Sequence, residues 1–244
     1  MSILKTAITA VALSICFSVP VQASIINGSF EASGGSFLGW TRSTTSGTVL
    51  ETAAFGSGPT DGGHQALLIS GFGTGAVSTV ATPSVESALG LTAGTLAGVN
   101  GGDPFQGSYI YQDITVSAGD EVFFDWNFLT NEGTPSIFND FGFFSVSGPE
   151  TVAMLLGDTI SPMSSSSSAA FSDETGFFTG SYMFSTGGTY RIGFGVMDEG
   201  DFMTDSGLLV DNVRLSAVPE PASMAIWTVA GLAGFTFVRR RLKK

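Results

Sequence analysis

The residue types that usually carry enzymatic chemistry are sparse in this chain. Histidine occurs once, at His64, and cysteine once, at Cys16. A Ser-His-Asp triad would have to use His64, no Gly-x-Ser-x-Gly elbow is present, and metal hydrolases normally gather several histidines. The 21 acidic residues always offer carboxylate pairs for glycoside cleavage, but their spacing singles out none. The sequence therefore predicts a protein that is not an enzyme.

Asp211 is the carboxylate whose position most needs a partner. On a strand it shares a face with Leu209 and Val213, so its side chain points where a core is expected. A buried charge must be compensated. A bound cation, an arginine or backbone hydrogen bonds would each do so.

Acidic and basic residues are distributed unevenly along the chain. Only one of 21 acids, Glu220, and six of nine basic residues lie outside residues 24–217, so that segment carries 20 acids against three arginines, a formal charge of −17. Such a surface repels nucleic acid and anionic membranes and attracts cations. Acidity therefore makes calcium a more plausible ligand than phosphate.

The elements that would position these residues are short strands. In residues 121–128 every second side chain, from Val122 to Phe128, is apolar, and residues 189–196 repeat the alternation. Similar runs occupy residues 108–116, 140–146, 151–156 and 177–184, separated by turn residues. We expect residues 24–217 to form one mainly β domain, an antiparallel β-sandwich of jelly-roll type with its phenylalanines in the core.

One stretch favours a helix instead of a strand. Pro83 follows a capping Thr82, and Val85 and Leu89 have helical spacing, which predicts one short surface helix. The glycines of residues 94–102 predict a mobile loop after it. The serine-rich residues 161–170 predict a second surface loop.

Two motifs at the ends of this domain resemble a known fold family. Residues 26–31 (Ile-Asn-Gly-Ser-Phe-Glu), followed by Gly39-Trp40, resemble the opening strand of galactose-binding-like jelly rolls, and residues 208–215 resemble their closing strand. In several such carbohydrate-binding modules a structural calcium is held by the glutamate of the first motif and the aspartate of the last. The resemblance thus implies Glu31 and Asp211 as metal ligands, with backbone carbonyls completing the six to eight oxygens that calcium takes.

The middle of the domain carries a further resemblance. Residues 107–132 and 139–141 are similar to a recurrent domain of secreted proteins with a sorting signal, for which no enzymatic activity is a family property. Its polar residues could clamp a cation or a loop, and capping or turn hydrogen bonds explain them about as well. They are Asp125, Asn127, Asn131, Glu132 and Asp140.

The N-terminus has the features of a signal peptide over residues 1–23. Lys5 precedes an apolar stretch that forms the expected signal helix, and Val21-Gln22-Ala23 has the small-residue spacing of a signal peptidase site. Cleavage between Ala23 and Ser24 would also remove Cys16. The mature chain would then lack any thiol.

The C-terminus, residues 218–244, has the features of a targeting segment that inserts into a membrane. The uncharged residues 222–238 would span roughly 25 Å as a transmembrane helix, enough to barely cross a bilayer core. The basic residues 239–244 behind it would stay cytoplasmic, so the upstream domain would face outward.

The order of parts in this tail resembles the PEP-CTERM sorting signal of Gram-negative bacteria. A Pro-Glu-Pro motif precedes a hydrophobic helix and an arginine cluster, and the resemblance implies recognition by an exosortase, a membrane transpeptidase thought to cut near the motif. A simple membrane anchor is the alternative. The residues concerned are Val218, Pro219, Glu220, Pro221, Arg239, Arg240 and Arg241.

Two functions fit this organisation. The first is a non-catalytic structural or adhesive protein, anchored in the inner membrane as a precursor and then delivered to the cell surface, the outer membrane or the exopolysaccharide matrix of a biofilm. The alternative is a carbohydrate-binding module that stacks sugar rings on exposed aromatic side chains. Its candidate platform is Trp40, Tyr109, Tyr111 or Phe123.

Overall fold

The computed structural model of the chain describes residues 24–32, 37–43, 49–53, 55–71, 80–163, 165–166, 171–200 and 203–217. The signal helix expected within residues 1–23 and the tail of residues 218–244, with its expected transmembrane helix, lie outside the described residues. In the part of the chain that is described, no helix has the length and apolar character needed to cross a membrane.

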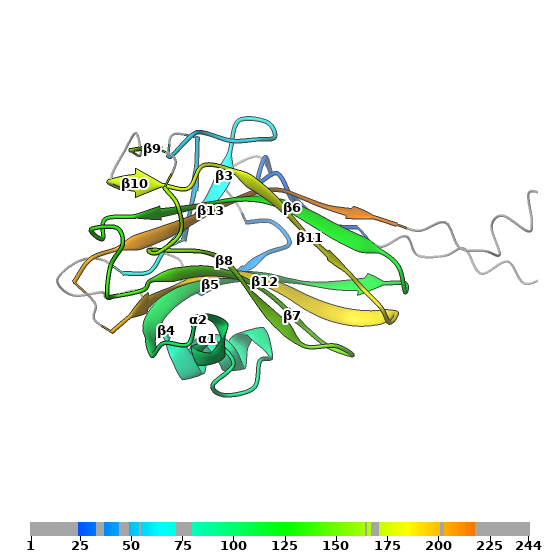
Figure 1. Cartoon of the computed structure of the whole chain (residues 1–244). Helices are drawn as coiled ribbons and strands as arrows, with labels where there is room; N and C mark the ends of the chain where they lie inside the picture. The colour runs from blue at the N-terminus through cyan, green and yellow to red at the C-terminus, as the bar shows by residue number, and fades with distance from the viewer. Residues whose placement is uncertain are drawn as a thin grey trace, which may run out of the picture.

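Two antiparallel sheets pack face to face, as the sequence predicted (Figure 1). The first has the order β1-β5-β12-β7-β8, with β4 also paired to β5, and the second has the order β2-β3-β13-β6-β10-β9, with β11 also paired to β6. The first sheet consists of β1 (Thr41–Arg42), β4 (Val80–Ala81), β5 (Pro104–Val116), β7 (Phe141–Ser147), β8 (Val152–Asp158) and β12 (Gly188–Glu199). The second consists of β2 (Val49–Thr52), β3 (Gln65–Ile69), β6 (Glu121–Thr130), β9 (Ser165–Ser166), β10 (Asp173–Glu174), β11 (Phe178–Met183) and β13 (Ser206–Ser216).

The core between the sheets follows from the alternation in the sequence. Phe124 of β6 stacks on Phe144 of β7, with ring centroids 4.6 Å apart, and meets Phe194 of β12 edge-on at 5.0 Å. All three rings are fully buried. Each such side chain contributes about 1.5–3 kcal/mol by leaving water, so the interior phenylalanines hold the two sheets together.

The predicted helix is present as α1 (Thr82–Leu89), and it covers the outer face of the first sheet (Figure 1). Pro83 stands in its first turn, but Thr82 does not cap it: the Thr82 hydroxyl donates to the carbonyl of Pro104 at 2.6 Å. The loop expected at residues 94–102 contains a second, one-turn helix, α2 (Ala97–Asn100). Buried Leu96 at its start packs with Val85 and Leu89 of α1, which explains the extra turn.

The opening motif was expected to be a strand and is instead a series of turns. Asn27 and Phe30 have positive φ values of 52° and 55°, which lie outside the β region of a regular strand. Gly28 lies against β13, where the Val213 amide donates to its carbonyl at 2.9 Å. The motif thus packs across the end of the second sheet without extending it.

Candidate functional site

The sandwich has an open side where two edge strands do not pair. There β8 is an edge strand of the first sheet, and β11, which pairs with β6, is an edge strand of the second. β8 also contacts β6 of the facing sheet. Trp126 of β6 points into the space between the sheets, as its parity predicted. Unlike Phe124 and Phe128 on the same face, which are fully buried, Trp126 is only partly buried, because the core layer ends at this edge.

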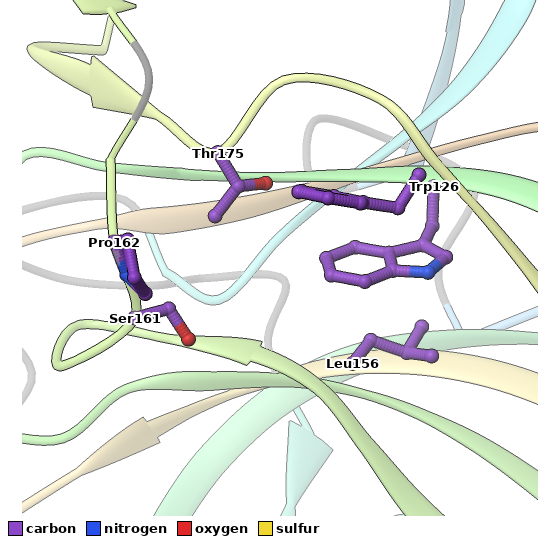
Figure 2. Close-up of a pocket in the computed structure, with 6 residues that line it drawn as sticks. Trp126, Leu156, Ser161, Pro162 and Thr175 are labelled. Carbon is purple, nitrogen blue, oxygen red and sulfur yellow. The ribbon is translucent and has the colours of Figure 1, made fainter.

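A pocket opens beside Trp126. It has a volume of about 230 Å³. Figure 2 shows the indole ring of Trp126 above Leu156, with Thr175, Pro162 and Ser161 across from it. Phe178 completes the lining and stacks on Trp126 with ring centroids 5.2 Å apart and an interplanar angle of 28°.

The polar groups of this pocket are few and already engaged. The Ser161 hydroxyl donates to Asp158 Oδ1 at 2.7 Å and accepts the Asp158 amide at 3.1 Å. Thr175 Oγ1 accepts the Phe128 amide at 3.0 Å and lies 3.0 Å from the carbonyl of Gly176. The pocket is therefore mainly apolar and aromatic, and none of its six lining side chains carries a charge.

The pocket's chemistry suits binding more than bond cleavage. Apolar and aromatic walls with a small number of polar groups are typical of small-ligand sites. An aromatic ring at such a site packs well against the C–H face of a sugar. Phe178 is 54% exposed, so a large apolar surface is presented to solvent at the pocket entrance.

The aromatic residues expected to stack on sugars lie elsewhere. Trp40 is buried in the core beside Phe30 and Phe194, and its indole N–H donates to the Asn27 carbonyl at 3.1 Å. The prediction that Trp40 is exposed is therefore wrong.

The other three candidates are partly buried on outer sheet faces. Tyr109 and Tyr111 stack on each other at 6.2 Å on the outer face of the first sheet, and Arg191 covers the ring of Tyr111 at 3.9 Å. Arg214 lies over the Phe123 ring at 5.2 Å. Cation–π contacts thus already use one face of two of these rings.

Asp211 is buried, as expected, but outside the core between the sheets. Its neighbours Leu208 and Val210 face that core, whereas Leu209 and Asp211 face the opposite side of the second sheet. A bulge follows Asp211, with Asn212 at a φ of 51°, and returns Val213 to the core. The assumption that Asp211 shares a face with Val213 is therefore wrong.

Both predicted metal ligands hold the turn that precedes β3. Asp211 Oδ2 accepts the amides of Thr60 at 2.7 Å and Asp61 at 2.9 Å. Glu31 Oε1 accepts the amides of Gly63 and His64, each at 2.6 Å. One carboxylate therefore anchors each end of the residue 60–64 turn.

The carboxylates are surrounded by hydrogen-bond donors, whereas a calcium site is lined by oxygen ligands. N–H groups point at Asp211 Oδ2 and Glu31 Oε1, where a cation would require free lone pairs. In the described ranges, no three acidic or histidine side chains are grouped so as to hold a metal ion. Glu31 and Asp211 as arranged fit backbone anchoring better than calcium, and calcium binding stays a prediction.

His64 lies between two carboxylates. Its Nδ1 is 3.2 Å from Glu31 Oε2 and its Nε2 is 3.4 Å from Glu51 Oε1. The hydrogen bond from His64, followed by those from the Gly63 and His64 amides, lowers the pKa of Glu31. The histidine is thus engaged in fixing the turn at residues 60–64.

The polar residues of the middle motif clamp loops in this structure. Asn127 joins Thr175 and Glu174, Asn131 accepts the Ser172 amide at 2.9 Å, and Glu132 accepts the Ser136 hydroxyl. Asp125 accepts hydrogen bonds from the Thr179 hydroxyl at 2.6 Å and from the Asn212 side-chain amide at 2.9 Å. Thr179 lies in β11 and Asn212 in the bulge of β13, so Asp125 connects these two segments.

Asp140 is the member of this set with the strongest electrostatic perturbation. Burial, then the neighbouring charge of Asp198, raise its pKa to about 8, although the Ser206 hydroxyl and the Glu199 amide donate to it. Asp140 ties the end of β12 to the start of β13, at the edge of β7. Its role in the structure is therefore to join strand ends.

The predicted processing residues have no structural description. Ala23 and the tail residues Val218, Pro219, Glu220, Pro221, Arg239, Arg240 and Arg241 all lie outside the described residues. Ser24, the expected first residue of the mature chain, is described and exposed.

Comparison with known proteins gives likenesses in structure alone. No family model and no curated protein matches the chain. The solved structure of TmCBM61 in complex with beta-1,4-galactotriose is similar with a TM-score of 0.46 and 13% identity, over 80% of this chain and 97% of that one. The K1 cleaved adhesin domain of Lys-gingipain from Porphyromonas gingivalis W83 has a TM-score of 0.43 and 13% identity, over 81% and 99%.

A third similar structure is the CBM22-1 xylan-binding domain of Paenibacillus barcinonensis Xyn10C. It has a TM-score of 0.34 and 14% identity, over 81% of this chain and 94% of that one. At these values the likeness extends to the β-sandwich arrangement and says nothing of the ligand.

Sequence reasoning missed the residues that form the pocket. Alternation assigns Trp126 to the core, and Phe178 lies in a run read only as a strand. What distinguishes these pocket residues from core residues is their place at an unpaired edge between the two sheets. That place can be identified only from the strand order.

Proposed function

We propose that this chain is an exported, non-catalytic glycan-binding protein of the cell surface or extracellular matrix. The observation that carries the proposal is the half-open pocket at the sandwich edge, where Trp126 and Phe178 stack on each other. A sugar ring has an apolar C–H face that packs on such rings and hydroxyl groups that remain toward water.

The absence of catalysis is part of this proposal. His64 is held between Glu31 and Glu51, and the lining of the pocket contains no carboxylate that could act as an acid or base. Glycoside cleavage needs two carboxylates flanking the bond. A pocket without them supports binding alone.

Export and sorting rest on the sequence of the two ends. The apolar helix and basic residues of the tail favour an outward-facing domain, and the Pro-Glu-Pro motif favours processing by an exosortase. Mass spectrometry of the native protein tests this: we expect the N-terminus at Ser24 and loss of residues 222–244. An intact tail recovered from the envelope would indicate an ordinary anchor.

Glycan binding is tested on a glycan array with the full-length protein in detergent. We expect selective retention on a small set of glycans, and competition by the free sugar. Phe178→Ala should strongly reduce retention because it removes one wall of the pocket. Met183→Ala, an exposed apolar residue on the same strand outside the pocket, is the matched control. Silence of the wild-type protein on the array would refute the proposal.

A further inference from the structure

We infer that the edge pocket selects an uncharged sugar that carries a methyl group, such as an N-acetyl or a 6-deoxy sugar. This inference rests on the proposed function and names the ligand class of the same site. It follows from three properties of the pocket: its hydrogen-bonding capacity, its size and its electrostatic surroundings.

The hydrogen-bonding capacity of the pocket is too small for a polyhydroxylated ring inserted whole. Ser161 gives its single hydroxyl proton to Asp158, so toward a ligand it can only accept. Thr175 is buried, and its hydroxyl already contacts main-chain and side-chain partners. The only side-chain N–H among the lining residues belongs to Trp126. Sugar hydroxyls buried here would lose water without finding partners, which weakens binding.

A methyl group avoids that loss. Leu156, Pro162 and the ring faces of Trp126 and Phe178 provide apolar contacts (Figure 2). A methyl inserted among them leaves no polar group unpaired and gains from leaving water. The acetamido methyl of an N-acetyl sugar and the C6 methyl of a deoxy sugar share this chemistry.

The size of the pocket agrees with partial insertion. Its volume of about 230 Å³ is below the roughly 300–1,000 Å³ that is typical of pockets enclosing a drug-sized ligand. A substituent with part of one ring fits, while the remaining sugars of a glycan would lie along the open edge. The pocket therefore binds a single sugar unit of a longer glycan.

The electrostatic surroundings disfavour acidic sugars. Buried Asp158 accepts the hydroxyl proton of the lining residue Ser161, and buried Glu174 directly precedes Thr175. The arginines of residues 24–217 stack on aromatic rings away from the pocket lining: Arg42 on Phe37, Arg191 on Tyr111 and Arg214 on Phe123. Two buried carboxylates next to lining residues of the pocket disfavour the negative charge of a uronate.

Calorimetric titration of the full-length protein in detergent with free monosaccharides, which carry no added methyl group, tests the inference. N-acetylglucosamine and N-acetylgalactosamine form one arm, fucose and rhamnose the second, and glucose, galactose and glucuronate the third. We expect one of the first two arms to bind at least tenfold more tightly than every sugar of the third, and which arm does so identifies the source of the methyl group. Equal or tighter binding of glucose, galactose or glucuronate would overturn the inference while leaving the proposed function intact, whereas failure of every glycan on the array and in solution would overturn both.

A pair of variants ties the selectivity to the pocket wall. Leu156→Asn places an amide among the lining residues and should reduce the preference for the methyl-bearing sugar toward unity. Leu155→Asn changes the adjacent, exposed leucine of the same strand, which does not line the pocket, and should leave the preference unchanged. Melting curves of both variants verify that the fold is retained. A preference that survives Leu156→Asn would contradict the inference.

Discussion

Asp211 of β13 lies directly opposite Asp125 of β6 in the ladder of the second sheet. Both are buried, at 0% and 7% exposure. Like charges at opposed positions destabilise a sheet, so each needs its own donors. Burial raises the pKa of Asp211 despite the amides of the residue 60–61 turn. Burial also acts to raise the pKa of Asp125, but hydrogen bonds from Thr179, Asn212 and Thr60, together with the charge of Arg214, outweigh it and lower the pKa overall.

Removing the Asp211 carboxylate should therefore destabilise the domain. In Asp211→Ala the amides of Thr60, Asp61 and Asn212 lose their acceptor, and we expect the free energy of unfolding to fall by about 1–3 kcal/mol. Denaturant titration measures the change. Glu31→Gln, which keeps an acceptor oxygen at an exposed site, should cost less than Asp211→Ala, because solvent screens interactions at the surface. An equal loss in both variants would contradict this account of the residue 60–64 turn.

Calcium should have little effect on the same turn. Because amide N–H groups already point at Glu31 and Asp211, we expect the melting temperature to be the same with a chelator and with millimolar calcium. Differential scanning calorimetry measures it. A rise of several degrees with calcium, absent in Asp211→Asn, would establish the calcium site that the sequence resemblance implies.

The raised pKa of Asp140 predicts how stability depends on pH. Its pKa is about 8 in the folded state against an ordinary value of 3.8, so between these values the folded state binds more protons than the unfolded state. Stability should therefore be greatest near the lower value and decrease as the pH rises toward 8. Asp140→Asn mimics the protonated acid, and we expect it to flatten this decrease.

Unfolding midpoints at pH 5 and pH 8 measure the effect. The variant should exceed the wild type at pH 8 and approach it at pH 5. Carboxyls with lowered pKa values, such as Glu150 at about 2, act with the opposite sign and only at lower pH, as that group titrates in the unfolded state near its ordinary 4.5. A wild-type stability that increases from pH 5 to pH 8 would contradict the assignment.

The opening motif has no room for a side chain at Gly28. A Cβ added there would lie 1.8 Å from the carbonyl oxygen of Val213, a backbone atom of β13. Gly28→Ala should cost at least 2 kcal/mol of unfolding free energy, typical of a severe steric change in a packed region. Gly98→Ala is the control: nothing lies within 4 Å of the added atom, it is helical, and stability should be unchanged or higher. Chemical denaturation of both variants tests the pair.

The longer strands were predictable from the sequence because alternation and local propensity agree with the fold, whereas short strands such as β2 and β3 were not predicted. Residues 121–128 and 189–196 alternate cleanly and lie within β6 and β12, and Pro83 correctly marked the first turn of α1. Those features are local, so a sequence pattern expresses them.

The sequence-based predictions were wrong where tertiary contacts determine the backbone conformation or the exposure of a side chain. The turns at residues 26–31, the bulge after Asp211 and the partial exposure of Trp126 depend on positive φ values and on strand order. Burial of Trp40 likewise comes from packing against distant rings. No period in the sequence encodes which edge of a sandwich remains open.

The most direct test of the central claim is a calorimetric titration of the full-length protein with the glycan that the array selects. Phe178 is exposed, so Phe178→Ala should retain the fold, with a melting temperature within about 2 °C of wild type. We predict that it weakens binding at least tenfold, about 1.4 kcal/mol, while Met183→Ala binds as the wild type does. Unchanged affinity in Phe178→Ala, or an equal loss in Met183→Ala, would show that the edge pocket is not the glycan site.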